Sequence, residues 1–231
     1  MNGYDLSLAG ATPTALGTGA LWWGAERLLC VSDLHLGKSE RQARRGGVLL
    51  PPYETADTLA RLADDIARCR PDTVICLGDS FDDAASAGAL DAAAAAALAR
   101  MRAGRRWIWI KGNHDAGADG HGGTVLDEIR IGPLVFRHIA AGDAPDPGVG
   151  EVSGHYHPKA GLALAGRAIS RPCFLCDGAR LILPAYGTYT GGLRWTDPAL
   201  QALMRPGAQA VLTGPTPRAF PVPRAAGRRA G

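Results

Sequence analysis

Side chains that bind metal ions recur in short blocks over the first two thirds of this 231-residue chain. Each block combines carboxylate, imidazole or amide groups with glycine or a second polar residue. The candidate ligands are Asp33, His35, Asp79, Asn113, His138, His155 and His157. This mixed set of oxygen and nitrogen donors suits manganese, iron or zinc, and it lacks the thiolates that are usual in structural zinc sites.

Seven donors are too many for one ion, but they suit two ions if one carboxylate bridges them. Asp79 is the natural bridge, because a carboxylate has two oxygens and Gly78 allows the backbone to turn tightly before it. Two ions about 3.5–4 Å apart form the clamp that is used for in-line displacement at phosphorus. A water held between them would lose a proton near neutral pH and attack the phosphorus.

Three more polar residues adjoin these candidate ligands. His114 follows Asn113 and is the best candidate to protonate the leaving oxygen or to stabilise the charge of the transition state. Asp115 is placed to orient His114 by hydrogen bonding, and Asp82 to hold a ligand imidazole from behind.

The elements that must position these residues alternate between strand and helix. Apolar runs predict buried strands at Arg27–Ser32, Thr73–Leu77 and Trp107–Ile110, and helical patterns occupy Tyr53–Cys69 and Ala87–Met101 between them. This order is typical of parallel β-α-β units. The polar blocks follow the predicted strands, where open α/β sheets bind their ligands.

The second half of the chain is β-rich. Short strands are predicted at Leu134–Arg137, Glu151–Ser153, Leu162–Ala165 and Leu181–Leu183. We therefore expect one α/β domain over residues 1–213, with two packed sheets flanked by helices. Residues 214–231 are rich in Pro, Gly and Arg and are predicted to form a mobile tail.

Composition limits the class of protein. With 46% hydrophobic and 20% charged residues the chain should fold, and its net charge of +3 is compatible with a polyanionic substrate. It contains no apolar run of the ~18 residues that a membrane span needs. The N-terminal segment is acidic and has no basic flank, so it does not resemble a secretory signal. The chain has an odd number of cysteines, five, which favours the reducing cytoplasm.

Several features have a simpler structural interpretation. Cys173 and Cys176 form a lone C-x-x-C, which we interpret as buried strand cysteines rather than half of a zinc site. His121 lies in a glycine-rich loop and is expected to be exposed and incidental. A structural histidine at a strand end is the alternative for His138, although the second ion would then lack a donor.

A basic segment follows the first polar block. Its residues are Lys38, Arg41, Arg44 and Arg45. They form either a rim that steers phosphate groups toward the ions or a solvated helix face, and the sequence favours neither alternative.

Together these blocks resemble the calcineurin-like metallophosphoesterase superfamily, whose pattern is D-x-H, GD-x-x-D, GNH[D/E], a lone His, then GH-x-H. The resemblance implies a β-sandwich flanked by helices and two divalent ions, usually manganese, iron or zinc. It also implies a catalytic role for His114. By this resemblance one ion is held by Asp33, His35, Asp79 and His157, and the other by Asp79, Asn113, His138 and His155.

Further segments resemble a bacterial subgroup, the ligase-associated DNA damage response endonucleases. They are SDLHLGK at 32–38, LPP at 50–52, GHYHP at 154–158 and LPAYGTYTGGL at 183–193. The resemblance implies a DNA substrate, with a DNA ligase, a helicase and an exonuclease as partners.

Two other functions remain open at this point. The same metal centre would serve a small-molecule phosphodiesterase or a phosphomonoesterase. A non-catalytic repair scaffold would keep the fold, but such proteins typically lose ligands, and all seven are present here.

Overall fold

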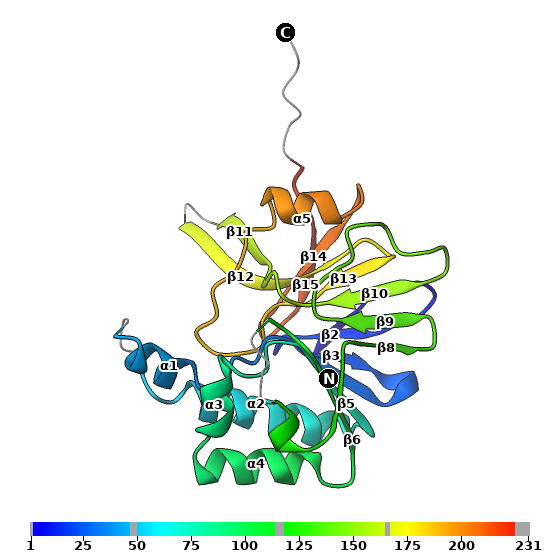
Figure 1. Ribbon diagram of the computed structural model, residues 1–231. Helices are drawn as coiled ribbons and strands as arrows, with labels where there is room; N and C mark the ends of the chain where they lie inside the picture. Colours follow the sequence, from blue (N-terminus) through cyan, green and yellow to red (C-terminus); the bar gives the residue numbers. More distant parts are fainter. Residues whose placement is uncertain (1, 47–49, 114–117, 165–166, 225–231) are drawn as a thin grey trace.

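Two β-sheets stack face to face, with helices on the outer face of each (Figure 1). This computed structural model describes residues 2–46, 50–113, 118–164 and 167–224. The arrangement confirms the α/β sandwich predicted from the sequence.

The first sheet has seven strands in the order β1-β2-β3-β4-β5-β6-β7. Their bounds are Gly3–Asp5, Thr14–Leu16, Leu21–Trp23, Leu28–Val31, Thr73–Leu77, Arg106–Ile110 and Thr124–Leu126. β4, β5, β6 and β7 run parallel, whereas β1, β2 and β3 add an antiparallel edge. The three strands predicted in the first half of the chain are therefore neighbours in one parallel sheet.

The second sheet is mixed, with the order β15-β14-β12-β13-β10-β9-β8 and β11 paired to β12. From β8 to β15 the bounds are Glu128–Ile131, Leu134–Arg137, Gly150–Ser153, Lys159–Leu164, Arg167–Cys176, Arg180–Ile182, Gln209–Leu212 and Arg218–Pro221. β9 and β10 are parallel, so their carboxyl ends lie at the same edge of the sheet.

Alternate side chains of the central strands enter two different cores. In β4, Leu28 and Cys30 face the second sheet, while Leu29 and Val31 pack toward the helices. All four are buried, as expected for a parallel strand that is covered on both faces. This double burial explains why the strand reads as a continuous apolar run in the sequence.

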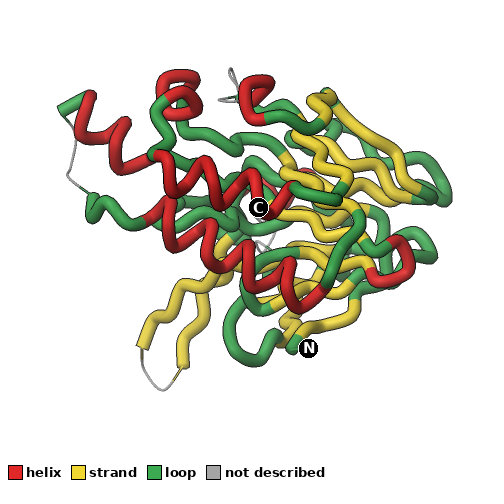
Figure 2. The backbone as a smooth tube through the Cα atoms, turned by 90° about the horizontal axis from the view of Figure 1, so that it is seen from below, coloured by secondary structure: helices red, strands yellow, loops and turns green. Residues whose placement is uncertain are grey.

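Helices α2 (Glu54–Cys69) and α4 (Ala92–Arg102) cover the outer face of the first sheet and lie side by side in Figure 2. Leu59, Leu62 and Ile66 of α2 form its buried stripe. The single helix predicted at Ala87–Met101 is instead two helices, α3 (Ala84–Gly88) and α4. The break occurs because the Asp91 carboxylate caps α4 by accepting a hydrogen bond from the Ala94 backbone N–H.

Helix α5 (Pro198–Leu203) packs on the outer face of the second sheet. The chain then returns to this sheet through β14 and β15, and Arg218–Pro221 pairs with Gln209–Leu212. Residues 218–221 of the predicted tail thus form an edge strand of this sheet. Residues 225–231 lie outside the described residues.

The cysteines and the strand tryptophans are core residues. Cys173 packs toward α5 whereas Cys176 packs between the sheets, because positions three apart on a strand face opposite sides. Trp107 and Trp109 pack in the core formed with the helices. The two cysteines of the C-x-x-C therefore do not converge on one metal ion.

Candidate metal centre

The candidate ligands lie where strands of both sheets end. Six of them form two groups whose ligand atoms lie within 4.8 Å of one another. The first cluster is Asp33, His35 and His157, and the second cluster is Asp79, His138 and His155. The clusters draw on loops after β4, β5, β9 and β10, so both sheets contribute.

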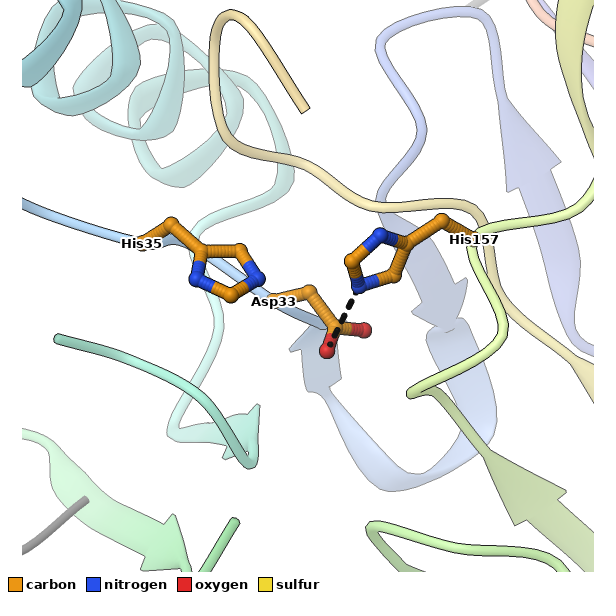
Figure 3. Close-up of side chains that lie close together, drawn as sticks. All are labelled: Asp33, His35 and His157. Carbon is orange, nitrogen blue, oxygen red and sulfur yellow. Dashed lines mark ion pairs between the residues drawn. The ribbon is translucent and has the colours of Figure 1, made fainter. Parts of the chain in front are cut away.

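The first cluster surrounds the fully buried carboxylate of Asp33. His157 Nε2 lies 3.1 Å from Asp33 Oδ1, and Figure 3 shows the rings of His35 and His157 on either side of the carboxylate. Within the described residues, neither Asp33 Oδ1 nor His157 Nε2 has a hydrogen-bond partner, although both atoms are buried. Buried polar atoms without partners are costly, and a bound cation would satisfy both.

The second cluster is arranged around Asp79. His138 Nδ1 lies 3.1 Å from the Leu77 carbonyl, so this nitrogen carries a proton and Nε2 is the nitrogen that faces the cluster and could bind a metal ion. That Nε2 lies 3.4 Å from Asp79 Oδ2 and 3.3 Å from His155 Nδ1. Two imidazoles and a carboxylate thus converge on one point, as metal ligands do.

Asp33 also connects the two clusters. Its Oδ2 accepts a hydrogen bond from the His155 backbone N–H at 3.0 Å, and its Oδ1 lies 3.9 Å from His138 Nδ1. The clusters are therefore adjacent, which suits a pair of ions. Asp79 belongs to the second cluster, and its predicted role as the bridge stays a prediction.

The histidines of the second cluster differ in pKa. Burial lowers the pKa of His138, but the hydrogen bond with Asp79 and the charges of Asp33 and Asp79 outweigh burial and raise it. Burial and the neighbouring His138 lower the pKa of His155. A lowered pKa keeps the His155 imidazole neutral, which is the form that binds metal.

Backbone strain is concentrated at the candidate ligands. Nine described residues other than glycine have positive φ, and five of them belong to the two clusters. Their φ angles are 54° at Asp33, 45° at His35, 45° at Asp79, 68° at His155 and 46° at His157. Such conformations cost about 1–2 kcal/mol each and persist where function requires them.

Two glycines allow the loops to approach this closely. A Cβ at Gly78, where φ is +78°, would lie 2.1 Å from His138 Nδ1. A Cβ at Gly154 would lie 1.8 Å from the Ser32 hydroxyl and 2.6 Å from Asp33 Oδ2. The glycine in each of these blocks is thus required by packing against the other sheet.

Asp82 supports the first cluster from behind. Its Oδ1 lies 3.0 Å from His35 Nδ1, and its Oδ2 accepts a hydrogen bond from Arg41 at 2.7 Å. Burial raises the pKa of Asp82, but the hydrogen bonds from His35 and Arg41 outweigh it and lower the pKa to about 2. The ionised carboxylate holds the His35 proton on Nδ1 and leaves the lone pair on Nε2.

The arginines of the predicted phosphate rim are engaged with carboxylates. Helix α1 (Lys38–Arg44), which lies beside α3, and the residue after it carry them. Arg44 binds Glu40 and Asp83, Arg45 Nη2 lies 3.9 Å from Asp83, and Arg41 binds Asp82. Their charges are largely neutralised, which favours the structural interpretation of this segment. Lys38 is half-buried at the start of α1.

Some predicted residues fall outside this geometry. Asn113 is exposed in the turn after β6, although Gly112 packs so closely on Asp79 that a Cβ there would lie 2.3 Å from Oδ1. His114 and Asp115 lie outside the described residues. His121 is not incidental, because its ring stacks on Phe81 and its Nε2 contacts the Ala87 carbonyl at 2.8 Å.

Sequence reasoning missed one segment of the site. The Tyr186 and Gly187 backbone N–H groups donate to the carbonyls of Ser32 and Asp33 at 2.7 and 3.0 Å. A Cβ at Gly192 would lie 2.0 Å from the His157 carbonyl oxygen. The glycines of the GTYTGG run were the available signal, since they permit this close approach.

The donors present fit divalent transition-metal ions. They combine carboxylate oxygen with imidazole nitrogen, four of the six are buried and two are half-buried, and they include the unsatisfied atoms Asp33 Oδ1 and His157 Nε2. No helix in the described parts of the chain is long and apolar enough to cross a membrane.

The family is identified by a model of the calcineurin-like phosphoesterases, which matches residues 26–169. This match spans more than half of the chain, so the chain belongs to that family and is a metal-dependent phosphoester hydrolase. The structure is similar to that of Pseudomonas putida nuclease MPE, with 29% identity and a TM-score of 0.71. The alignment covers 95% of this chain and 100% of that chain, in agreement with the subgroup resemblance. A search of curated proteins found no match.

Proposed function

We propose that this protein is a dimetal phosphodiesterase that cleaves DNA internally and acts in DNA repair. The observation that carries the proposal is the pair of adjacent carboxylate and imidazole clusters at the strand ends. The similarity to a nuclease over nearly the whole chain supports a nucleic acid substrate. A DNA ligase, a helicase and an exonuclease remain the proposed partners, and the cytoplasm the proposed location.

Each cluster holds one ion in this proposal. Asp33, His35 and His157 bind the first ion, and Asp79, His138 and His155 bind the second. Asp79 would also help to hold the first ion, and Asn113 would help to hold the second. Manganese is the proposed metal, with iron and zinc as alternatives, since the donor types suit all three.

The ions supply Lewis acidity, which makes a bound water nucleophilic near neutral pH and neutralises charge on the phosphoryl oxygens. The remaining roles belong to side chains of the protein. His114 protonates the leaving oxygen, and Asp115 orients its ring. Asp82 holds His35 in the required tautomer through the 3.0 Å contact.

The test compares DNA cleavage by the wild type and Asp79→Asn with added Mn²⁺. We expect Asp79→Asn to lose more than about a hundredfold in rate, because it removes a buried ligand charge. Asp127→Asn is the matched control, since that carboxylate is exposed and pairs with Lys111.

The panel also includes RNA, nucleotides, phosphomonoesters and bis-(p-nitrophenyl) phosphate. A wild type that prefers a free monoester would contradict the DNA assignment. Equal inertness of the wild type and Asp79→Asn on every ester would contradict hydrolysis altogether.

A further inference from the structure

A cavity of about 730 Å³ runs beside helix α2, on the other side of the 186–187 segment from Asp33. We call it the α2 groove. One wall is α2, with Arg61 and Arg68, and the opposite wall includes Arg171 of β12 and the loop before β15. Arg61 and Arg68 are seven residues apart, so they face the same side of the helix at about 10 Å spacing.

The charge of the groove is positive. Three arginines line it, but Arg61 pairs with Asp57 and Arg68 pairs with the buried Asp65, so the net positive charge comes from Arg171. Arg61 has a structural role, because it donates to the Tyr186 carbonyl and the Thr188 hydroxyl at 2.8 and 2.9 Å. Arg68 keeps 55% of its side chain exposed, and Arg171 is exposed as well. These two guanidinium groups are accessible to an anionic ligand.

One wall of the groove is hydrogen-bonded to the segment that bears the first cluster. This wall, at Tyr186 and Gly187, is hydrogen-bonded to Ser32 and Asp33. A Cβ at Gly187 would lie 2.1 Å from the Leu34 carbonyl oxygen. The groove wall at residues 186–187 therefore lies directly beside the segment that bears the first cluster, at the spacing of about 5 Å that separates hydrogen-bonded backbones.

An aromatic pair lies where the groove meets the start of α2. Tyr189 lines the groove, and its ring centroid is 5.7 Å from that of Tyr53, which is 55% exposed. Tyr189 has a φ of +63°, which is rare for a bulky residue. The exposed ring of Tyr53, supported by Tyr189, can stack on a base of a nucleic acid strand, as aromatic side chains do in proteins that bind single strands.

We propose that the α2 groove binds the part of the substrate strand that flanks the cleaved phosphodiester. Arg171 contacts its phosphates, and the Tyr53–Tyr189 pair stacks on a base. This inference rests on the proposed function and extends it, since it assigns a strand-binding site outside the two metal clusters.

The test measures binding of a short labelled DNA strand to the full chain in EDTA, by fluorescence anisotropy over a salt series. Without ions, the carboxylates of the clusters repel DNA, so affinity reports other surfaces. We expect Arg171→Ala to raise the Kd about tenfold and to reduce the salt slope by about one. Arg130→Ala is the matched control, because Arg130 is exposed on β8 at the far edge of the second sheet.

Stacking is tested with Tyr53→Ala and with a strand that carries abasic sites. Tyr53→Ala should weaken binding of the normal strand at least about fivefold and leave binding of the abasic strand within about twofold. Equal effects of Arg171→Ala and Arg130→Ala would overturn the phosphate contact. Equal weakening of both strands by Tyr53→Ala would overturn the stacking contact.

The two proposals fail separately. If the wild type cleaves DNA but the groove variants bind it as the wild type does, the groove assignment is wrong and the nuclease stands. If the groove variants weaken binding but the wild type cleaves no nucleic acid, the nuclease assignment is wrong.

Discussion

Individual side chains at the two clusters depend on residues behind them. Asp82 is the clearest case, because its carboxylate is hydrogen-bonded to both His35 and Arg41 and is itself almost fully buried. Removing its charge leaves the His35 tautomer undetermined and Arg41 without this acceptor.

We therefore expect Asp82→Asn to weaken Mn²⁺ binding by about 10–100-fold while the fold is retained. Calorimetric titration of the metal-free protein measures the change, and circular dichroism checks the fold. Asp72→Asn is the control, since Asp72 binds Arg27 in an exposed pair away from the clusters. Unchanged metal affinity in Asp82→Asn would refute the supporting role.

The cysteines give a second prediction at this scale. All five are buried, and burial raises the pKa of Cys173 to about 12 and that of Cys69 to about 11. A raised thiol pKa keeps the group neutral until the pH approaches that value, so at pH 8 about one Cys173 in ten thousand is a thiolate.

Native protein should therefore react with iodoacetamide far more slowly at pH 8 than protein in denaturant. Mass spectrometry of the alkylated chain measures both rates. Rapid native modification, or zinc released by thiol reagents, would contradict the interpretation of these residues as packed core.

At the scale of elements, the loops that follow parallel strands are held in strained conformations by close packing between the sheets. Gly78 combines positive φ with close packing, since a Cβ there would lie 2.1 Å from His138 Nδ1. Gly104 has a similar φ of +72°, and among the described residues no contact to its Cβ position lies within 4 Å.

Comparing Gly78 with Gly104 separates the cost of backbone strain from the cost of a steric clash. Gly104→Ala should lower the free energy of unfolding by about 1 kcal/mol, the cost of the backbone conformation alone. Gly78→Ala should lower it by at least about 2 kcal/mol more, because the ring of His138 must move. Urea unfolding in EDTA measures both, and equal losses would show that the ring moves away without cost.

At the scale of the whole molecule, metal binding and stability are coupled. The two candidate clusters join segments from both sheets, so metal ions would bind the folded chain and not the unfolded one. At a hundredfold excess over Kd, an ion adds about 2.7 kcal/mol to the free energy of unfolding.

Mn²⁺ should therefore raise the Tm of the metal-free protein by about 5–10 °C. Differential scanning calorimetry measures the shift, and Asp79→Asn should show much less of it. An identical shift in wild type and Asp79→Asn would indicate that Mn²⁺ acts at another place on the protein.

The sequence by itself determined the local features of this protein. Continuous apolar runs predicted β4, β5 and β6, because strands buried on both faces leave no polar positions. The types and order of the candidate ligands also indicated a metal-dependent phosphoester hydrolase, since ligand chemistry depends on side-chain type. The sequence analysis did not predict the helix break before Asp91, which depends on the cap that Asp91 provides. It also did not predict the strand after Gly214, which forms by pairing with β14.

Only the tertiary structure decided which side chains meet. Arg41 binds Asp82, which lies 41 residues later in the chain, and the Tyr186 hydroxyl donates a hydrogen bond to Asp65 of α2, which lies 121 residues earlier. The α2 groove likewise combines a helix, a strand and two loops from distant parts of the chain. Such contacts arise from sheet order and layer packing, which local periodicity does not encode.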